Sequence, residues 1–293
     1  MISRLSQDNN GVYGFTLDSD TGDIVKIQKK PLLIPGLKKI TQISVGADFA
    51  LALDATGHVF AWGCGQQCEL GHRLIERRRA LALLPNPLRL SRSAKIVSIH
   101  AAMNHAFAID SKGDTWAWGS NNFTQTGSGL SADEEDGTVA VVQRVRSLVG
   151  KEMKMIEGGS HHSVGVTRSG ECFVWGRTDG GQLGLDVSKL PLDDPTKVLV
   201  DSRNKPRILL QPTPLPISNC AHAASGSDHS LLVVSEGKLY SWGFNATYQC
   251  GQGTDDDIWV AKQMNGKHIR DQKITWAGGG GQYSMFASRL EGE

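Results

Sequence analysis

Residues 43–63 read ISVGADFALALDATGHVFAWG, and this stretch decides the fold because the chain repeats its pattern three more times. Apolar residues alternate with small or polar ones on both sides of Thr56-Gly57, which is typical of two strands joined by a tight turn. Each copy contains such a turn glycine and ends in Trp-Gly. The turn glycines are Gly57, Gly113, Gly170 and Gly237, and the tryptophans are Trp62, Trp118, Trp175 and Trp242.

The turn glycines lie 56, 57 and 67 residues apart. A period of this length indicates stacked or radial repeats, because one unit cannot bury its own apolar face. Each unit is predicted to hold four short strands, and radial units of this kind form β-propellers, in which ring closure protects the strand edges. We therefore expect an all-β protein with a single propeller domain over residues 1–293. Full repeats are expected over about 38–251 and a partial last blade over 252–293.

The four copies can be compared with one another, which separates structural positions from variable ones. The tryptophans recur in every copy and are predicted to pack inside the blades. His105, His162 and His229 recur at one position, where Phe49 and Tyr283 are variants, and are interpreted as buried and bonded to backbone. The preceding residue is polar but differs in identity, and equivalent positions of a radial repeat share one face. These candidate face residues are Asp48, Asn104, His161, Asp228 and Gln282; alternatively, they only form turns.

Composition and charge exclude several classes of protein. The net charge of +1 gives no overall attraction to nucleic acid. No apolar run approaches the length of a membrane span, and the N-terminus does not resemble a signal peptide. The odd number of cysteines, without a disulfide framework, favours a reducing compartment. No metal site or cofactor is predicted, because Cys64 and Cys68 have no second ligand pair. The other cysteines are Cys172, Cys220 and Cys250.

Motifs of covalent catalysis are missing from the sequence. It contains neither a Walker-type phosphate loop nor a nucleophile elbow. His161, His162 and Ser163 are consecutive, but neighbouring side chains on a strand point to opposite faces, which argues against a triad. We therefore expect a protein that acts by binding and not an enzyme that makes or breaks bonds.

The combination of Gly-x-x-His, Asp/Ser-x-Gly, Trp-Gly and x-Leu-Gly resembles the repeat of the regulator of chromosome condensation family, whose members are seven-bladed propellers. Residues 8–15, DNNGVYGF, resemble the β-wedge of the family's guanine nucleotide exchange factors for the GTPase Ran, and the wedge hairpin is expected over about 6–15. Residues 35–37, 60–67 and 157–163 resemble the fungal form. The resemblance covers nearly the whole chain from Gln7.

The resemblance implies a nuclear guanine nucleotide exchange factor that supports nucleocytoplasmic transport and chromosome and cell-cycle regulation. Its implied partner is a Ran-type small GTPase, with nucleosomes or chromatin as a further partner of the full-length form. Exchange would require no covalent step, since the protein stabilises the nucleotide-free GTPase. The residues that match the family's wedge and face are Asp8, Asn9, Asn10, Gly11, Val12, Asp48, Asn122 and His161; weaker candidates are Asn104, Asp228 and Gln282.

The chain also departs from the family pattern. Only about five of the seven blades can be counted, so we expect an N-terminally truncated chain that lacks upstream blades and a basic tail, and an open or strained ring. Gln7 and His72 stand where the family commonly has basic residues. The alternative function is an interaction propeller of the same repeat family without exchange activity.

Overall fold

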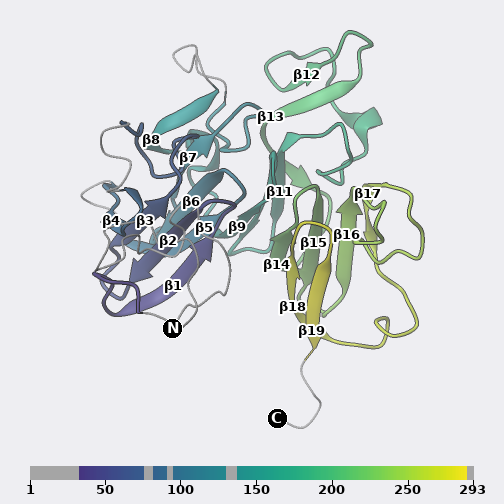
Figure 1. The fold of residues 1–293 in the computed structure, drawn as a ribbon. Coiled ribbons are helices and arrows are strands. Elements are labelled where there is room, and N and C mark those ends of the chain that lie inside the picture. The colour runs from purple at the N-terminus through teal and green to yellow at the C-terminus, as the bar shows by residue number, and fades with distance from the viewer. Residues whose placement is uncertain (1–32, 76–81, 91–94, 130–136, 289–293) are drawn as a thin grey trace.

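Strands and turns make up almost all of the computed structural model, which describes residues 33–75, 82–90, 95–129 and 137–288 (Figure 1). The sheets follow one another around an arc, from the purple blade 1 through teal and green to a yellow hairpin near the C-terminus. Contacts join each sheet to its neighbour along the chain, such as β1 (Ile40–Val45) to β5 (Ile96–Ala101) and β14 (Cys220–Ser225) to β18 (Ile274–Gly279). No helix in these ranges is long and apolar enough to cross a membrane.

Each blade is an antiparallel sheet whose strands follow chain order, except at the outer edge of blade 3. Blade 1 contains β1 (Ile40–Val45), β2 (Phe49–Asp54), β3 (Val59–Gly63) and β4 (Asn86–Pro87). Blade 2 contains β5 (Ile96–Ala101), β6 (His105–Asp110), β7 (Thr115–Ser120) and β8 (Thr138–Arg144). Blade 3 contains β9 (Met153–Gly158), β10 (His162–Thr167), β11 (Cys172–Arg177), β12 (Val198–Val200) and β13 (Pro206–Leu215). Blade 4 contains β14 (Cys220–Ser225), β15 (His229–Val234), β16 (Leu239–Gly243) and β17 (Ile258–Gln263).

The all-β propeller architecture predicted from the repeats is confirmed. After blade 4, β18 (Ile274–Gly279) and β19 (Ser284–Ser288) form a two-stranded sheet, so the described residues comprise four blades and the first half of a fifth. The hairpin turns within the blades form where expected, because Gly57, Gly113, Gly170 and Gly237 all have positive φ.

Blade 3 carries an insertion, which explains the spacing of 67 residues between its turn glycine and the next. The insertion, residues 186–206, contains the 3-10 turn Val187–Lys189 (η3) and β12. β12 pairs with the outer edge of the ten-residue strand β13, so this sheet has five strands. In Figure 1, β12 and β13 project beyond the other blades.

The core lies between neighbouring sheets, as a radial repeat requires. One buried cluster joins Val164 and Val174 of blade 3 to Leu232 of blade 4. The four repeat tryptophans are at most 1% exposed, which confirms their predicted burial. Each buried indole withdraws roughly 150–250 Å² from water, and its N–H needs a partner. In blades 2, 3 and 4 that partner is a backbone carbonyl of the preceding blade: Trp118 Nε1 donates to Glu69 O at 2.7 Å, Trp175 to Gln125 O at 2.8 Å and Trp242 to Gln182 O at 2.7 Å.

The recurring histidines are buried as predicted, but their shared bonding partner is a serine. Each Nε2 bonds to a serine hydroxyl of the next blade, and His229 also has a backbone hydrogen bond with Tyr283, as predicted. His162 Nε2 lies 2.9 Å from Ser230 Oγ, and Ser230 donates to the same Gln182 carbonyl that Trp242 uses. Because the hydroxyl proton goes to that carbonyl, His162 must donate through Nε2–H. The equivalent pairs are His105 with Ser163 and His229 with Ser284.

The boundary between blades 1 and 2 lacks this histidine–serine bond, and the residues found there instead support its structural role. Blade 1 has Phe49 in place of the histidine, and blade 2 has Ala106 in place of the serine. Both residues are fully buried in one cluster between these two blades. An apolar ring therefore meets an apolar partner, and no hydroxyl is left without its donor.

Candidate protein-binding face

The candidate face residues all lie in the loop between the first and second strands of a unit. The glycine of the Trp-Gly pair fixes this loop. In blade 3, Arg177 N–H donates to His161 O at 2.9 Å, and Gly176, near the end of β11, has a φ of 103°. A Cβ on Gly176 would lie 2.6 Å from His161 O, so only glycine permits this approach. The same backbone bond is donated to Asp48, Asn104 and Asp228 in the other blades, at 2.7–2.9 Å.

Backbone hydrogen bonds also join these loops from blade to blade. Ala47 N–H donates to Met103 O at 3.0 Å, and Met103 N–H to Gly159 O at 3.4 Å. Ser160 N–H then donates to Ser227 O at 2.8 Å, and Ser227 N–H to Gly280 O at 3.1 Å. The five loops therefore lie side by side along the arc. Asp48 and Gln282 are exposed there, and Asn104, His161 and Asp228 are half-buried.

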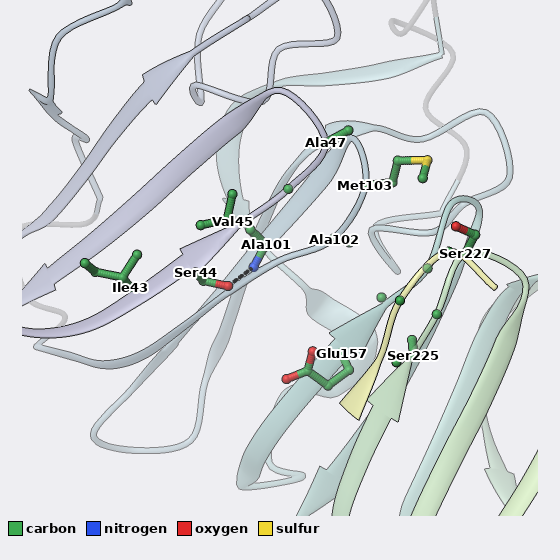
Figure 2. A pocket seen from close by; sticks show the side chains of 17 residues that line it. Ile43, Ser44, Val45, Ala47, Ala101, Ala102, Met103, Glu157, Ser225 and Ser227 are labelled. Carbon is green, nitrogen blue, oxygen red and sulfur yellow. Dashed lines mark hydrogen bonds between the residues drawn. The ribbon is translucent and has the colours of Figure 1, made fainter. Parts of the chain in front are cut away.

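The inner strands and their loops surround a cavity of about 460 Å³ on the concave side of the arc (Figure 2). Its lining is mostly glycine, alanine and serine, and Glu157 is the ionisable side chain that Figure 2 labels there. Glu157 Oε1 lies 3.2 Å from His100 Nδ1, so this carboxylate already has a partner. The cavity has few side chains that could bind a ligand specifically, so the polar loops at the end of the arc remain the candidate site.

His161 belongs to an aromatic and cationic cluster around Phe123 that the sequence did not predict. Its ring lies 4.7 Å from the ring of Phe123, which comes from the loop after β7 in blade 2. The Arg177 and Arg207 guanidinium carbons lie 5.4 and 5.8 Å from the Phe123 ring centroid. Burial, and next the charge of Arg177, lowers the pKa of His161, which favours the neutral ring at pH 7.

Asn122 precedes Phe123 and is exposed, so the structure brings Asn122 and His161 into one neighbourhood across the boundary between blades 2 and 3. Its Oδ1 accepts from Ser120 Oγ at 3.5 Å, a long bond. Sequence reasoning missed Phe123, Arg177 and Arg207 because they differ from their equivalents in other repeats and come together only when the loops pack.

Asp48 lies two blades away and has a different environment. The carboxyl group of Glu69 is buried nearby, and burial, with a contribution from Asp48, raises its pKa to about 7. Glu69 Oε2 accepts from Gln67 N–H at 2.7 Å. The equivalent residues in blades 2, 3 and 4 are glutamines that accept the same bond through Oε1: Gln125, Gln182 and Gln249. In the sequence, Glu69 could have been singled out because the other three full repeats have glutamine at this position.

The remaining candidates have fewer contacts. Asp228 Oδ1 accepts from Gln182 Nε2 at 3.5 Å, which joins blades 3 and 4 at this end. Gln282 is exposed beside Tyr283. The wedge candidates Asp8, Asn9, Asn10, Gly11 and Val12 lie outside the described residues. All five cysteines are free thiols, and no cluster of metal-ligating side chains occurs within the described ranges.

Comparison with known proteins decides the family. Residues 4–286 match the family model of the RCC1-like domain. The chain belongs to this family. Protein pim1 of Schizosaccharomyces pombe is 39% identical over 253 residues, which cover 86% of this chain and 46% of that protein. The guanine nucleotide exchange factor SRM1 of Saccharomyces cerevisiae is 35% identical over 282 residues, which cover 94% of this chain and 56% of that protein.

A solved structure of the same family agrees with the fold. Prp20p from Saccharomyces cerevisiae matches 94% of this chain and 62% of its own, with a TM-score of 0.82 at 34% identity. Prp20p is described together with its binding properties to Gsp1p and histones. This RCC1-like chain spans about half the length of the curated relatives it matches.

Proposed function

We propose that this RCC1-like chain contributes the GTPase-binding face of a guanine nucleotide exchange factor for a Ran-type small GTPase. The observation that carries the proposal is the 35% identity over 94% of the chain with an exchange factor. The proposal includes a nuclear location and a role in nucleocytoplasmic transport and chromosome and cell-cycle regulation. The binding of Prp20p to histones supports nucleosomes as a second partner of a longer form.

The proposed mechanism is a shift in a binding equilibrium and involves no covalent step or cofactor. The polar loops would engage the GTPase through Asp48, Asn122 and His161, while the wedge at Asp8–Val12 reaches its nucleotide site. A face that binds the empty GTPase more tightly than the loaded one promotes nucleotide release by that difference in affinity. The neutral ring of His161 suits this role, because it both donates and accepts a hydrogen bond.

The named relatives favour exchange over the alternative of an interaction propeller without exchange activity. Release of a fluorescent guanine nucleotide from the loaded GTPase separates the two. An exchange factor accelerates release in proportion to its concentration, whereas a scaffold leaves it at the spontaneous rate.

We expect Asp48→Ala and His161→Ala to weaken GTPase binding with little change in melting temperature, because both side chains lie at the surface of the face. Each change should cost about 1–3 kcal/mol of binding free energy if the side chain makes a buried polar contact with the partner. Titration calorimetry with the nucleotide-free GTPase measures the loss. Lys112→Ala, in the exposed turn at the other end of blade 2, is the control. Equal affinities for the face variants and the control would contradict the assignment.

A further inference from the structure

A second cavity, of about 710 Å³, opens between the blade 3 insertion and blade 4. Val187 and Asp201 of the insertion line one side, and Trp259 of β17 lines the other. Arg203, Lys205 and Arg207 also line it, from the turn before β13 and from the start of β13. The extra residues of the third repeat therefore build one wall of this pocket.

The pocket opens at the same end of the arc as the candidate face. β11 pairs Arg177 with Ile208, and Thr178 N–H donates to Arg207 O at 3.0 Å, which places Arg207 beside the end of β11. In blade 4, Gly243 pairs with Ile258, so Trp259 lies next to the end of β16. Both strand ends are those that hold the candidate loops, through bonds to His161 O and Asp228 O. Arg207 also contacts Phe123, and Phe123 contacts His161, so pocket and face are continuous.

The charges of the pocket leave cations available for a ligand. Asp201 Oδ1 accepts from the backbone N–H groups of Arg203 and Lys205, at 2.8 and 2.9 Å, and is occupied in shaping the turn. Asp179 pairs with Arg177. The side chains of Arg203 and Lys205 are exposed and form no ion pair with any residue in the described part of the chain. A carboxylate ligand would meet two exposed cations there.

Trp259 supplies an apolar contact beside these cations. It is 48% exposed, whereas the four repeat tryptophans are at most 1% exposed. A half-exposed tryptophan at the edge of a pocket is the kind of residue that dominates protein interfaces, because partner binding buries its remaining apolar surface. Cations on one wall and an indole on the other match a short acidic segment that also carries an apolar residue.

We propose that this pocket binds an acidic segment of the GTPase that docks on the candidate face, an inference that rests on the proposed function. Continuity with the His161 cluster favours the same partner for both sites. A pocket bounded by the insertion accommodates a few side chains and not the path of a long polyanion. The insertion thus adds an electrostatic contact that raises the association rate and the affinity.

The test is charge reversal in the full chain, with the double variant Arg203→Glu/Lys205→Glu. Stopped-flow association and equilibrium titration with the nucleotide-free GTPase are performed at low and high salt. We expect about tenfold slower association at low salt and a weaker dependence of affinity on salt, as is typical when charges at the rim of an interface are reversed. The neutral variant Arg203→Gln/Lys205→Gln should lie between wild type and charge reversal. Trp259→Ala should mainly accelerate dissociation.

The control is Lys112→Glu/Lys238→Glu, which makes the same change in charge on exposed turns at the opposite end of blades 2 and 4. The pocket inference is supported if this control binds with wild-type kinetics while the Arg203/Lys205 and Trp259 variants show the changes described above. If the Arg203 and Lys205 variants bind like wild type while Asp48→Ala still weakens binding, the pocket inference is overturned and the proposed function stands. If they lose only binding to a DNA fragment, the pocket inference is likewise overturned. If wild type does not bind the GTPase, both fail.

Discussion

His161 and His162 are consecutive residues with opposite environments. His162 is fully buried and bonds to Ser230 of the next blade, whereas the half-buried His161 contacts Phe123 at the end of the arc. The difference follows from their places at the start of a strand, where side chains alternate between faces. One histidine therefore holds two blades together, and its neighbour is available to a partner.

The apolar pair of Phe49 and Ala106 suggests a test of the histidine–serine bond between blades. His162→Phe should destabilise the protein by about 1 kcal/mol, because Ser230 Oγ loses its donor inside the core. The double variant His162→Phe/Ser230→Ala should recover part of this loss, since it recreates the apolar pair between blades 1 and 2. A double-mutant cycle from urea unfolding measures the coupling. Additive effects of the two substitutions would show that histidine and serine are energetically independent.

The buried histidines should make stability fall in mild acid. Burial, as the first cause, lowers the pKa of His105 and His162 to about 3 and of His229 to about 4. The unfolded chain titrates near 6.5, so it binds more protons than the folded chain below that pH. The contribution of these histidines to the free energy of unfolding is complete above pH 6.5 and decreases as the pH falls toward 4 and 3. The limiting slope is about 1.4 kcal/mol per pH unit for each histidine.

Glu69 acts in the opposite sense, because its raised pKa of about 7 makes the folded chain bind a proton that the unfolded chain releases above about 4.5. The measurement is urea unfolding from pH 7.5 to 4.5 in a Glu69→Gln background, where glutamine occupies the position as in the other blades. His105→Phe/Ser163→Ala in that background should show a shallower slope. Parallel slopes with and without His105 would refute the role of the buried histidine.

At the scale of elements, the loop between the first and second strands is the functional unit of each blade. The residue after the Trp-Gly glycine donates its N–H to the carbonyl of this loop, and further backbone bonds join the loop to the next blade. The scaffold is therefore the same in every blade, and the side chains on it vary. Among the described blades, blade 3 has a fifth strand that the others lack, and the proposed wedge would be a second element outside the repeat.

The wedge should matter more for nucleotide release than for docking. Asp8-Asn9-Asn10-Gly11 is rich in residues that tolerate positive φ, and Val12 and Tyr13 follow it, as in a short projecting hairpin. Replacing residues 8–12 with a Gly-Ser turn should lower the rate of nucleotide release far more than the affinity for the GTPase. Both are measured on one preparation, and an unchanged melting temperature is the control for folding. Release at the wild-type rate would mean that the stretch is an ordinary surface hairpin.

At the scale of the whole molecule, the described sheets form an arc whose last member has only two strands. The β18–β19 sheet exposes Trp276, Tyr283, Met285 and Phe286. A sheet edge with exposed large apolar side chains favours association with another chain.

We therefore expect the isolated chain to self-associate as its concentration rises, and Met285→Lys/Phe286→Lys to reduce this association. Sedimentation velocity over a range of concentrations measures both effects. Trp259→Lys, at the pocket in blade 4, serves as the control for the general effect of added charge. A monodisperse monomer at all concentrations would contradict the expectation.

The propeller architecture could be predicted from the sequence alone, because every repeat carries the same local pattern of residues. Alternating apolar residues, turn glycines and Trp-Gly pairs predict the strands of each repeat, whereas the fifth strand of blade 3 was not predicted. The equivalence of the repeats also predicted that Asp48, His161 and their counterparts occupy matching loops. These inferences depend on short-range periodicity, which one chain carrying several copies displays without any structure.

Contacts between side chains of different blades could not be predicted from the repeats and are seen only in the folded molecule. The bond from each histidine to a serine lies across a blade boundary, and His105 and Ser163 are 58 residues apart in sequence. The contacts of Phe123 with His161 and Arg207, and the pocket between the insertion and Trp259, likewise join segments of different repeats. Repeat periodicity fixes where a residue stands within its blade. Its neighbour in the next blade depends on how two twisted sheets pack side by side, and that packing is a property of the assembled arc.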